Sequence, residues 1–121
     1  MAAEVLQITD DDLLRRWVPR DQVDNDGKIM SIFFRTTDQS ADLAKLRSRK
    51  ETQTDGKAGS GLVEFTAGHA RHVGLNPVHD PCPPEAPTNH AHVLCKGKLS
   101  SGKAQRLRSL ADYCVKCGES A

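Results

Sequence analysis

Four cysteines are the residues of this chain best suited to hold a metal ion. Cys114 and Cys117 form a C-x-x-C pair, and Cys82 and Cys95 lie earlier in the chain. Two thiolates at the C-x-x-C spacing can share one tetrahedral zinc ion, and the other two would complete a four-thiolate site. The sequence therefore makes zinc the candidate cofactor. The alternatives are unrelated thiols packed as small apolar side chains, and a redox pair, although a thioredoxin-type pair normally opens a helix.

Histidines form a second candidate site. All five lie between residues 69 and 92, and His90 and His92 are two residues apart. On a strand, two such side chains point to the same face, where they can bind a metal or act as acid and base. Asp80 and Glu85 are close enough in sequence to orient an imidazole ring. We take His90 and His92 as the candidate catalytic pair; the alternative is a solvent-facing pair without a function.

The segment GKLSSGKA, residues 97–104, resembles the start of a phosphate-binding loop in its spacing alone. Ala104 stands where a magnesium-binding hydroxyl is required, and too little chain follows for the sheet of a P-loop enzyme. The same segment still predicts an anion site at the start of a helix, formed by free backbone N–H groups together with Ser100, Ser101 and Lys103. The alternative is an ordinary capped helix.

Charge and hydropathy narrow the class of partner. The chain has 17 lysines and arginines against 16 acidic residues, so its net charge does not indicate nucleic acid. A basic stretch from Lys96 to Arg108 favours either a solvated helix face or an anion contact. No signal peptide and no apolar run near the ~20 residues of a membrane helix is present. We therefore expect a cytoplasmic protein that does not enter membranes, with an unidentified protein as a candidate partner.

The elements that must position these residues are short and mixed. The patterns predict helices over 8–19, 40–49, 66–74 and 100–114, and strands over 28–35, 62–65, 75–79 and 90–95. A mobile polar loop is expected near 50–61 and a proline-rich loop near 80–88. Short connections favour a single α+β domain over 1–121, with a small, mainly antiparallel sheet and three or four short helices.

Three functions remain open at this level. The first is a small cytosolic binding or regulatory domain that zinc would stabilise. The second is a small enzyme acting on a phosphate-containing substrate, a nucleotide or RNA, with His90 and His92 as its reactive groups and the basic helix start as its anion site. The third is a protein-interaction element. We favour the first, because no catalytic motif is complete.

Overall fold

The computed structural model describes residues 5–56, 58–81 and 89–121. Within these ranges the chain forms six strands, three α-helices and three short 3-10 helices. In chain order they are β1 (Leu13–Val18), η1 (Arg20–Gln22), η2 (Ser31–Arg35), β2 (Gln39–Leu43), η3 (Ala44–Leu46), α1 (Arg49–Asp55), β3 (Gly61–Thr66), α2 (Ala67–His72), β4 (Asn76–His79), β5 (His92–Lys96), α3 (Ser101–Leu110) and β6 (Asp112–Val115).

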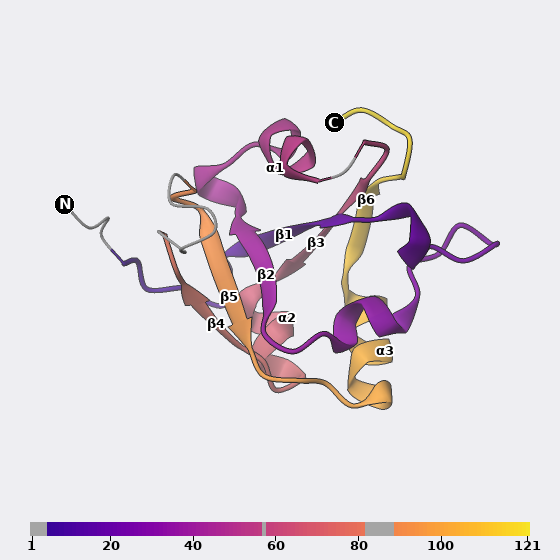
Figure 1. Cartoon of the computed structure of the whole chain (residues 1–121). Helices are drawn as coiled ribbons and strands as arrows, with labels where there is room; N and C mark the ends of the chain where they lie inside the picture. Colours follow the sequence, from indigo (N-terminus) through magenta and orange to yellow (C-terminus); the bar gives the residue numbers. More distant parts are fainter. Residues whose placement is uncertain (1–4, 57, 82–88) are drawn as a thin grey trace.

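The six strands form one antiparallel sheet in the order β4-β5-β2-β1-β3-β6 (Figure 1). The predicted class, a single α+β domain with a small antiparallel sheet and three or four short helices, is confirmed. β1 lies in the interior of the sheet, although its neighbours β2 and β3 come later in the chain. The centre of the sheet is therefore built from contacts that are distant in sequence.

One face of the sheet carries the hydrophobic core. Alternate residues of a strand point to opposite faces, so Leu14 of β1 shares a face with its cross-strand partner Phe65 of β3. The helices α2 and α3 and the short helix η2 supply Ala70, Leu107 and Phe34 to the same core. Figure 1 shows α2 and α3 close together, with α1 on the other side of the sheet.

The other face is polar, and α1 contacts it. Arg15 of β1 lies opposite Glu64 on β3 and opposite Asp42 on β2. From α1, Thr52 Oγ1 donates to Asp42 and Arg49 Nη2 donates to Glu64, both at 2.8 Å. Because these charged groups satisfy one another, the strands can bury polar residues on this face.

Several predicted elements in the first half of the chain were wrong. Residues 8–19, expected to be helical, contain β1, and the expected helix over 40–49 begins within β2. The expected strand over 28–35 contains η2 instead. The expected loop over 50–61 begins inside α1, because Ser48 and Glu51 form a reciprocal capping box that starts a helix. For β1 and β2 long-range strand pairing outweighed the local pattern, and for α1 the capping box did.

The second half of the chain follows the prediction more closely. β4 lies within its expected segment, β3 extends one residue beyond its segment at each end, and β5 ends one residue beyond its own. Thr66 caps α2 as expected. α3 begins after its cap Ser100 but ends at Leu110. The end of the expected helix over 100–114 was wrong, because Asp112–Val115 form β6, which pairs with β3. Most of the expected proline-rich loop, residues 82–88, lies outside the described residues. Among the residues that are described, no helix has the length and apolar character needed to cross a membrane.

Candidate functional site

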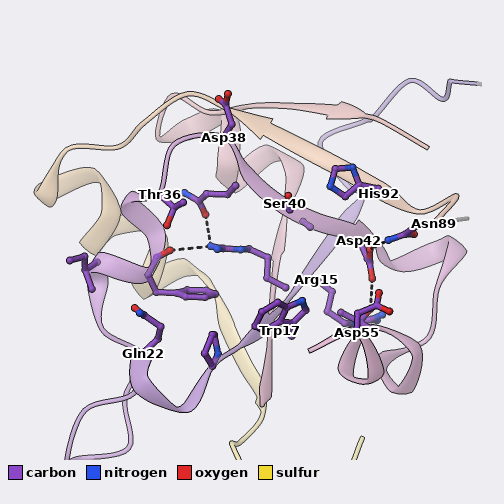
Figure 2. Close-up of a pocket in the computed structure, with 17 residues that line it drawn as sticks. Arg15, Trp17, Gln22, Thr36, Asp38, Ser40, Asp42, Asp55, Asn89 and His92 are labelled. Carbon is purple, nitrogen blue, oxygen red and sulfur yellow. Dashed lines mark hydrogen bonds between the residues drawn. The ribbon is translucent and has the colours of Figure 1, made fainter. Parts of the chain in front are cut away.

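β1 and β2 pair over two residues and then separate. Their ladder joins Leu14 to Leu43 and Arg15 to Asp42, whereas β2 pairs with β5 over four residues. A cavity of about 520 Å³ is lined by residues of both strands where the ladder has ended (Figure 2). This volume lies within the range of small-molecule sites. Because the two strands no longer pair there, side chains from both faces of β1 reach the cavity.

Arg16 brings a positive charge to the cavity wall. Its Nη1 donates to Gln39 Oε1 at 2.6 Å and to Phe33 O at 3.3 Å, and its guanidinium carbon lies 3.9 Å from the centre of the Phe33 ring. Gln39 is itself held, since its Nε2 donates to Phe34 O at 2.6 Å. Burial lowers the pKa of Arg16 to about 10, so the guanidinium is still charged at neutral pH.

No carboxylate neutralises this guanidinium within residues 5–56, 58–81 and 89–121. The ion pairs formed there involve other cations, including Arg15, Arg47 and Arg49. A charge taken out of water without a partner is unfavourable unless it has a role or a ligand. Arg16 is therefore the residue that distinguishes this cavity from an ordinary surface cleft.

Further donors in the cavity have no partner in the described part of the chain. The hydrogen bonds of Arg16 use only Nη1, which leaves its Nε and Nη2, and those of Arg15 use only Nε and Nη1. Trp17 Nε1 and Ser40 Oγ make no hydrogen bond to a described residue, and both residues line the cavity (Figure 2). The wall is thus rich in free N–H and O–H groups.

The carboxylates that line the cavity, in contrast, already have partners. Asp42 accepts a hydrogen bond from Thr52 Oγ1 at 2.8 Å. Asp55 forms an ion pair with Arg47, and Asp38 accepts a hydrogen bond from a backbone N–H at 2.9 Å. Each of these carboxylates accepts at least one hydrogen bond, whereas the donors named above have no described partner, so the cavity favours a ligand that is rich in acceptors.

A buried ion-pair network fixes the polar floor beneath α1. Glu64 is 5% exposed and accepts from Arg15 Nε at 2.7 Å and from Arg49 Nη2 at 2.8 Å. Burial alone would raise the pKa of Glu64, but the hydrogen bonds from Arg49 and Arg15 outweigh it and hold that pKa below its ordinary value. Asn89 Nδ2 adds a bond to Asp42 Oδ1 at 3.0 Å, which ties the segment before β5 to β2 (Figure 2).

Of the predicted histidine pair, one member lines the cavity. His92 is 8% exposed, lies opposite Asp42 in the ladder, and has its Nδ1 3.2 Å from Asp80 O and 3.4 Å from Asp80 Oδ2. His92 Nε2 has no hydrogen bond to a described residue. His90 precedes β5 and is exposed, and its carbonyl oxygen lies 2.7 Å from His79 Nε2. The fold therefore does not present His90 and His92 together on one strand face.

Of the four predicted zinc ligands, Cys95, Cys114 and Cys117 are described, and Cys95 lies far from the other two. Cys95 is buried in the core on β5, whereas Cys114 lies on β6 and Cys117 follows it. Three strands separate β5 from β6, which at about 4.8 Å per strand amounts to about 19 Å across the sheet. One zinc ion cannot bridge that distance with bonds of about 2.3 Å, so in this structure Cys95 does not share a zinc ion with Cys114 and Cys117, and zinc binding by the four cysteines stays a prediction. Cys82 lies outside the described residues.

Residues 5–56, 58–81 and 89–121 contain no group of three or more His, Cys, Asp and Glu side chains that could hold a metal ion. The cysteine thiols have local partners instead. Cys114 Sγ lies 3.5 Å from Leu62 O, and Cys117 Sγ lies 3.4 Å from Val18 O. Burial raises the pKa of Cys95 to about 11, so its thiol stays protonated at neutral pH.

The predicted anion site at the start of α3 has the geometry of a capped helix. Ser100 Oγ accepts from Lys103 N at 3.3 Å, and the side chains of Ser101 and Lys103 are exposed. The structure places this helix start outside the cavity between β1 and β2. Anion binding by these three residues stays a prediction.

The residues that sequence reasoning missed are those of β1 and β2. Arg16 and Trp17 were assigned to a surface helix, where an arginine is an ordinary solvated charge. Gln39, whose amide holds Arg16, lay just before a second predicted helix. Leu13–Val18 reads LLRRWV, with its two arginines adjacent, so the segment lacks the alternation of a half-buried strand, and nothing in it separates Arg16 from Arg15.

Comparison of the chain with models of protein families, with curated proteins and with solved structures found no match.

Proposed function

We propose that this domain binds a small organic oxyanion, a phosphate or a carboxylate, in the cavity between β1 and β2. The observation that carries the proposal is Arg16, a half-buried guanidinium with no carboxylate partner among the described residues, held at the cavity wall by Gln39 and Phe33. A planar guanidinium that is fixed in advance loses little conformational freedom when it binds, and its N–H groups match the geometry of an oxyanion.

The other free donors support the same ligand class. Arg15 Nη2, Trp17 Nε1 and Ser40 Oγ supply N–H and O–H groups, whereas Asp42 and Asp55 are already paired and offer little to a cationic ligand. This proposal is a specific form of the small binding domain expected from the sequence. Its anion contact lies on β1 rather than at the start of α3.

Isothermal titration calorimetry tests the proposal with phosphate, succinate and uncharged glycerol. We expect phosphate and succinate to bind the wild-type protein and glycerol not to bind. Loss of charge-assisted hydrogen bonds costs about 1.5–3 kcal/mol, so Arg16→Met should weaken both anions about 10- to 150-fold. Arg106→Met is the matched control, because Arg106 is exposed on α3. Equal weakening by both variants would indicate general electrostatics and refute the site.

His92 supports a second candidate, a small enzyme acting on a phosphate-containing substrate such as a nucleotide or RNA. The imidazole lines the same cavity, Asp80 orients its Nδ1, and Nε2 faces no described partner. A histidine held in this way can transfer a proton. Screening of nucleotides and RNA for turnover tests the idea: His92→Gln should abolish activity and leave phosphate binding intact, and His90→Gln should change neither. Activity that survives His92→Gln would eliminate this candidate.

Three expectations from the sequence remain separate proposals. A cytoplasmic location agrees with the free thiols of Cys95, Cys114 and Cys117, because disulfides are rare in reducing compartments. Zinc binding and an interaction with a protein partner are each tested on the purified protein, the first by metal analysis and the second by co-purification.

A further inference from the structure

Trp17 is the only tryptophan of the chain and does not belong to the hydrophobic core. It alternates with Arg16 along β1 and so points to the polar face of the sheet. Trp17 is half-buried and lines the cavity (Figure 2), which Arg16 lines as well. Large aromatic side chains in small domains usually contribute to the core, where their burial stabilises the fold. On this face Trp17 lies opposite the fully buried Leu62, and the part of its side chain that stays accessible lines the cavity.

One side of the indole is already covered by backbone. Gly56, the residue that ends α1, is so close that a Cβ there would lie 3.0 Å from Trp17 Cγ and Cδ2. The absence of a side chain at Gly56 lets α1 support the ring from behind. Pro19 and Ile32 add apolar wall to the same cavity, and Ile32 is 59% exposed. The cavity thus combines an apolar, aromatic part with the free donors of Arg16.

We infer that the oxyanion bound here is carried by a planar aromatic ring, as in a nucleoside monophosphate or an aromatic carboxylate, and that the ring stacks on Trp17 while the oxyanion contacts Arg16. The inference rests on the proposed binding of an oxyanion and goes further by naming the ligand class. Stacking on tryptophan adds affinity regardless of the identity of the ring, because every aromatic ring offers a π-face.

Two matched pairs of ligands separate the ring from the oxyanion. Adenosine monophosphate is compared with ribose 5-phosphate, and benzoate with cyclohexanecarboxylate, by calorimetry and by the fluorescence of the single tryptophan. Stacking predicts that each aromatic ligand binds about 5- to 150-fold tighter than its non-aromatic partner and quenches Trp17 emission. Equal affinities within both pairs would overturn the inference. If phosphate and ribose 5-phosphate bind through Arg16 in that case, the proposed function stands; if none of the anions binds, it falls as well.

Variants then assign the effect to the indole. Trp17→Leu should reduce the aromatic preference to less than twofold, and Trp17→Phe, which keeps a ring, should retain most of it. Gly56→Ala is the complementary change: its backbone angles suit alanine, but the new Cβ must displace the indole. It should weaken adenosine monophosphate more than ribose 5-phosphate. An aromatic preference that persists unchanged in Trp17→Leu and in Gly56→Ala would refute stacking on Trp17.

Discussion

Replacing Arg16 by methionine removes a charge from the cavity while keeping an unbranched chain against Phe33. Burial lowers the pKa of Arg16 from 12.5 to about 10, which corresponds to about 3 kcal/mol of unfavourable free energy for the charged form. The change relieves this penalty. It also takes a donor from Gln39 Oε1 and Phe33 O, at about 1–3 kcal/mol for each acceptor left unpaired. Water in the open cavity can reach both acceptors, which favours the lower end of that range.

The two effects nearly cancel, so the free energy of unfolding of Arg16→Met without ligand should lie within about 1 kcal/mol of wild type. Ligand changes this balance. Phosphate at ten times its dissociation constant stabilises the wild-type protein by about 1.4 kcal/mol, or roughly 5 °C in Tm for a domain of this size. Arg16→Met should show no such rise.

Urea denaturation without phosphate and thermal denaturation across a phosphate series measure the two quantities separately. Arg106→Met serves as control and should retain the full rise in Tm. A loss of more than about 3 kcal/mol in ligand-free Arg16→Met, the loss expected when a buried pair is broken, would show that Arg16 is structural. A phosphate-dependent rise in Tm equal to that of wild type would show that the anion binds elsewhere.

Four further predictions concern the fold and its thiols. Glu64→Gln leaves Arg15 buried without its carboxylate and should lower the free energy of unfolding by about 3 kcal/mol in urea denaturation at pH 7. Because the folded-state pKa of Glu64 is lowered, the stability that its carboxylate contributes is complete above the unfolded pKa of 4.5 and is lost as the pH falls below that value. A difference in free energy of unfolding from wild type that stays constant down to pH 3 would contradict the ion pairs of Glu64 with Arg15 and Arg49. Ser48→Ala removes the capping box of α1 and should cost about 1 kcal/mol by the same assay, whereas Ser48→Asp should cost much less. Because the pKa of Cys95 is about 11 and the residue is buried, iodoacetamide at pH 8 should label Cys117 first and leave Cys95 unmodified until the protein unfolds, as mass spectrometry can check. A strong chelator should leave the far-ultraviolet circular dichroism unchanged, since the described cysteines do not converge; loss of signal together with release of one zinc per chain would contradict the structure.

The sequence was a good guide where local signals and tertiary contacts agree. Thr66 and Ser100 are caps that act within their own turn, and the two helices that they begin were expected, although α3 ends four residues before the end of the expected segment 100–114. β3 also followed its apolar, β-branched composition. The α+β class was therefore accessible from the sequence, because these local signals occur in both helix-like and strand-like segments.

The first half of the chain was not predictable in the same way. β1 contains two arginines and was taken for an amphipathic helix, because Leu13, Leu14 and Trp17 are spaced as on one helix face. The structure stabilises the strand through partners far along the chain: Arg15 lies opposite Glu64, 49 residues away. A pairing with so distant a residue cannot be recognised from the residues of the segment alone.

The candidate site, like the fold, was only partly predictable from the sequence. His92 was identified because histidine is informative by type alone, and the structure places it in the cavity. Arg16 was not identified, because an arginine becomes distinctive only once its surroundings are known. Its hydrogen bond to Gln39 crosses from β1 to β2, two strands that the sequence analysis did not predict.

The most direct test of the account is a titration of the isotopically labelled protein with phosphate, followed by two-dimensional NMR of the backbone amides and the arginine side-chain Nε–H groups. Binding in the cavity predicts the largest shifts at Arg16 Nε–H and at the amides of residues 16–17 and 39–40, with little change at residues 100–103. Shifts concentrated at the start of α3, around Ser100 and Lys103, or no saturable shift at Arg16, would contradict it.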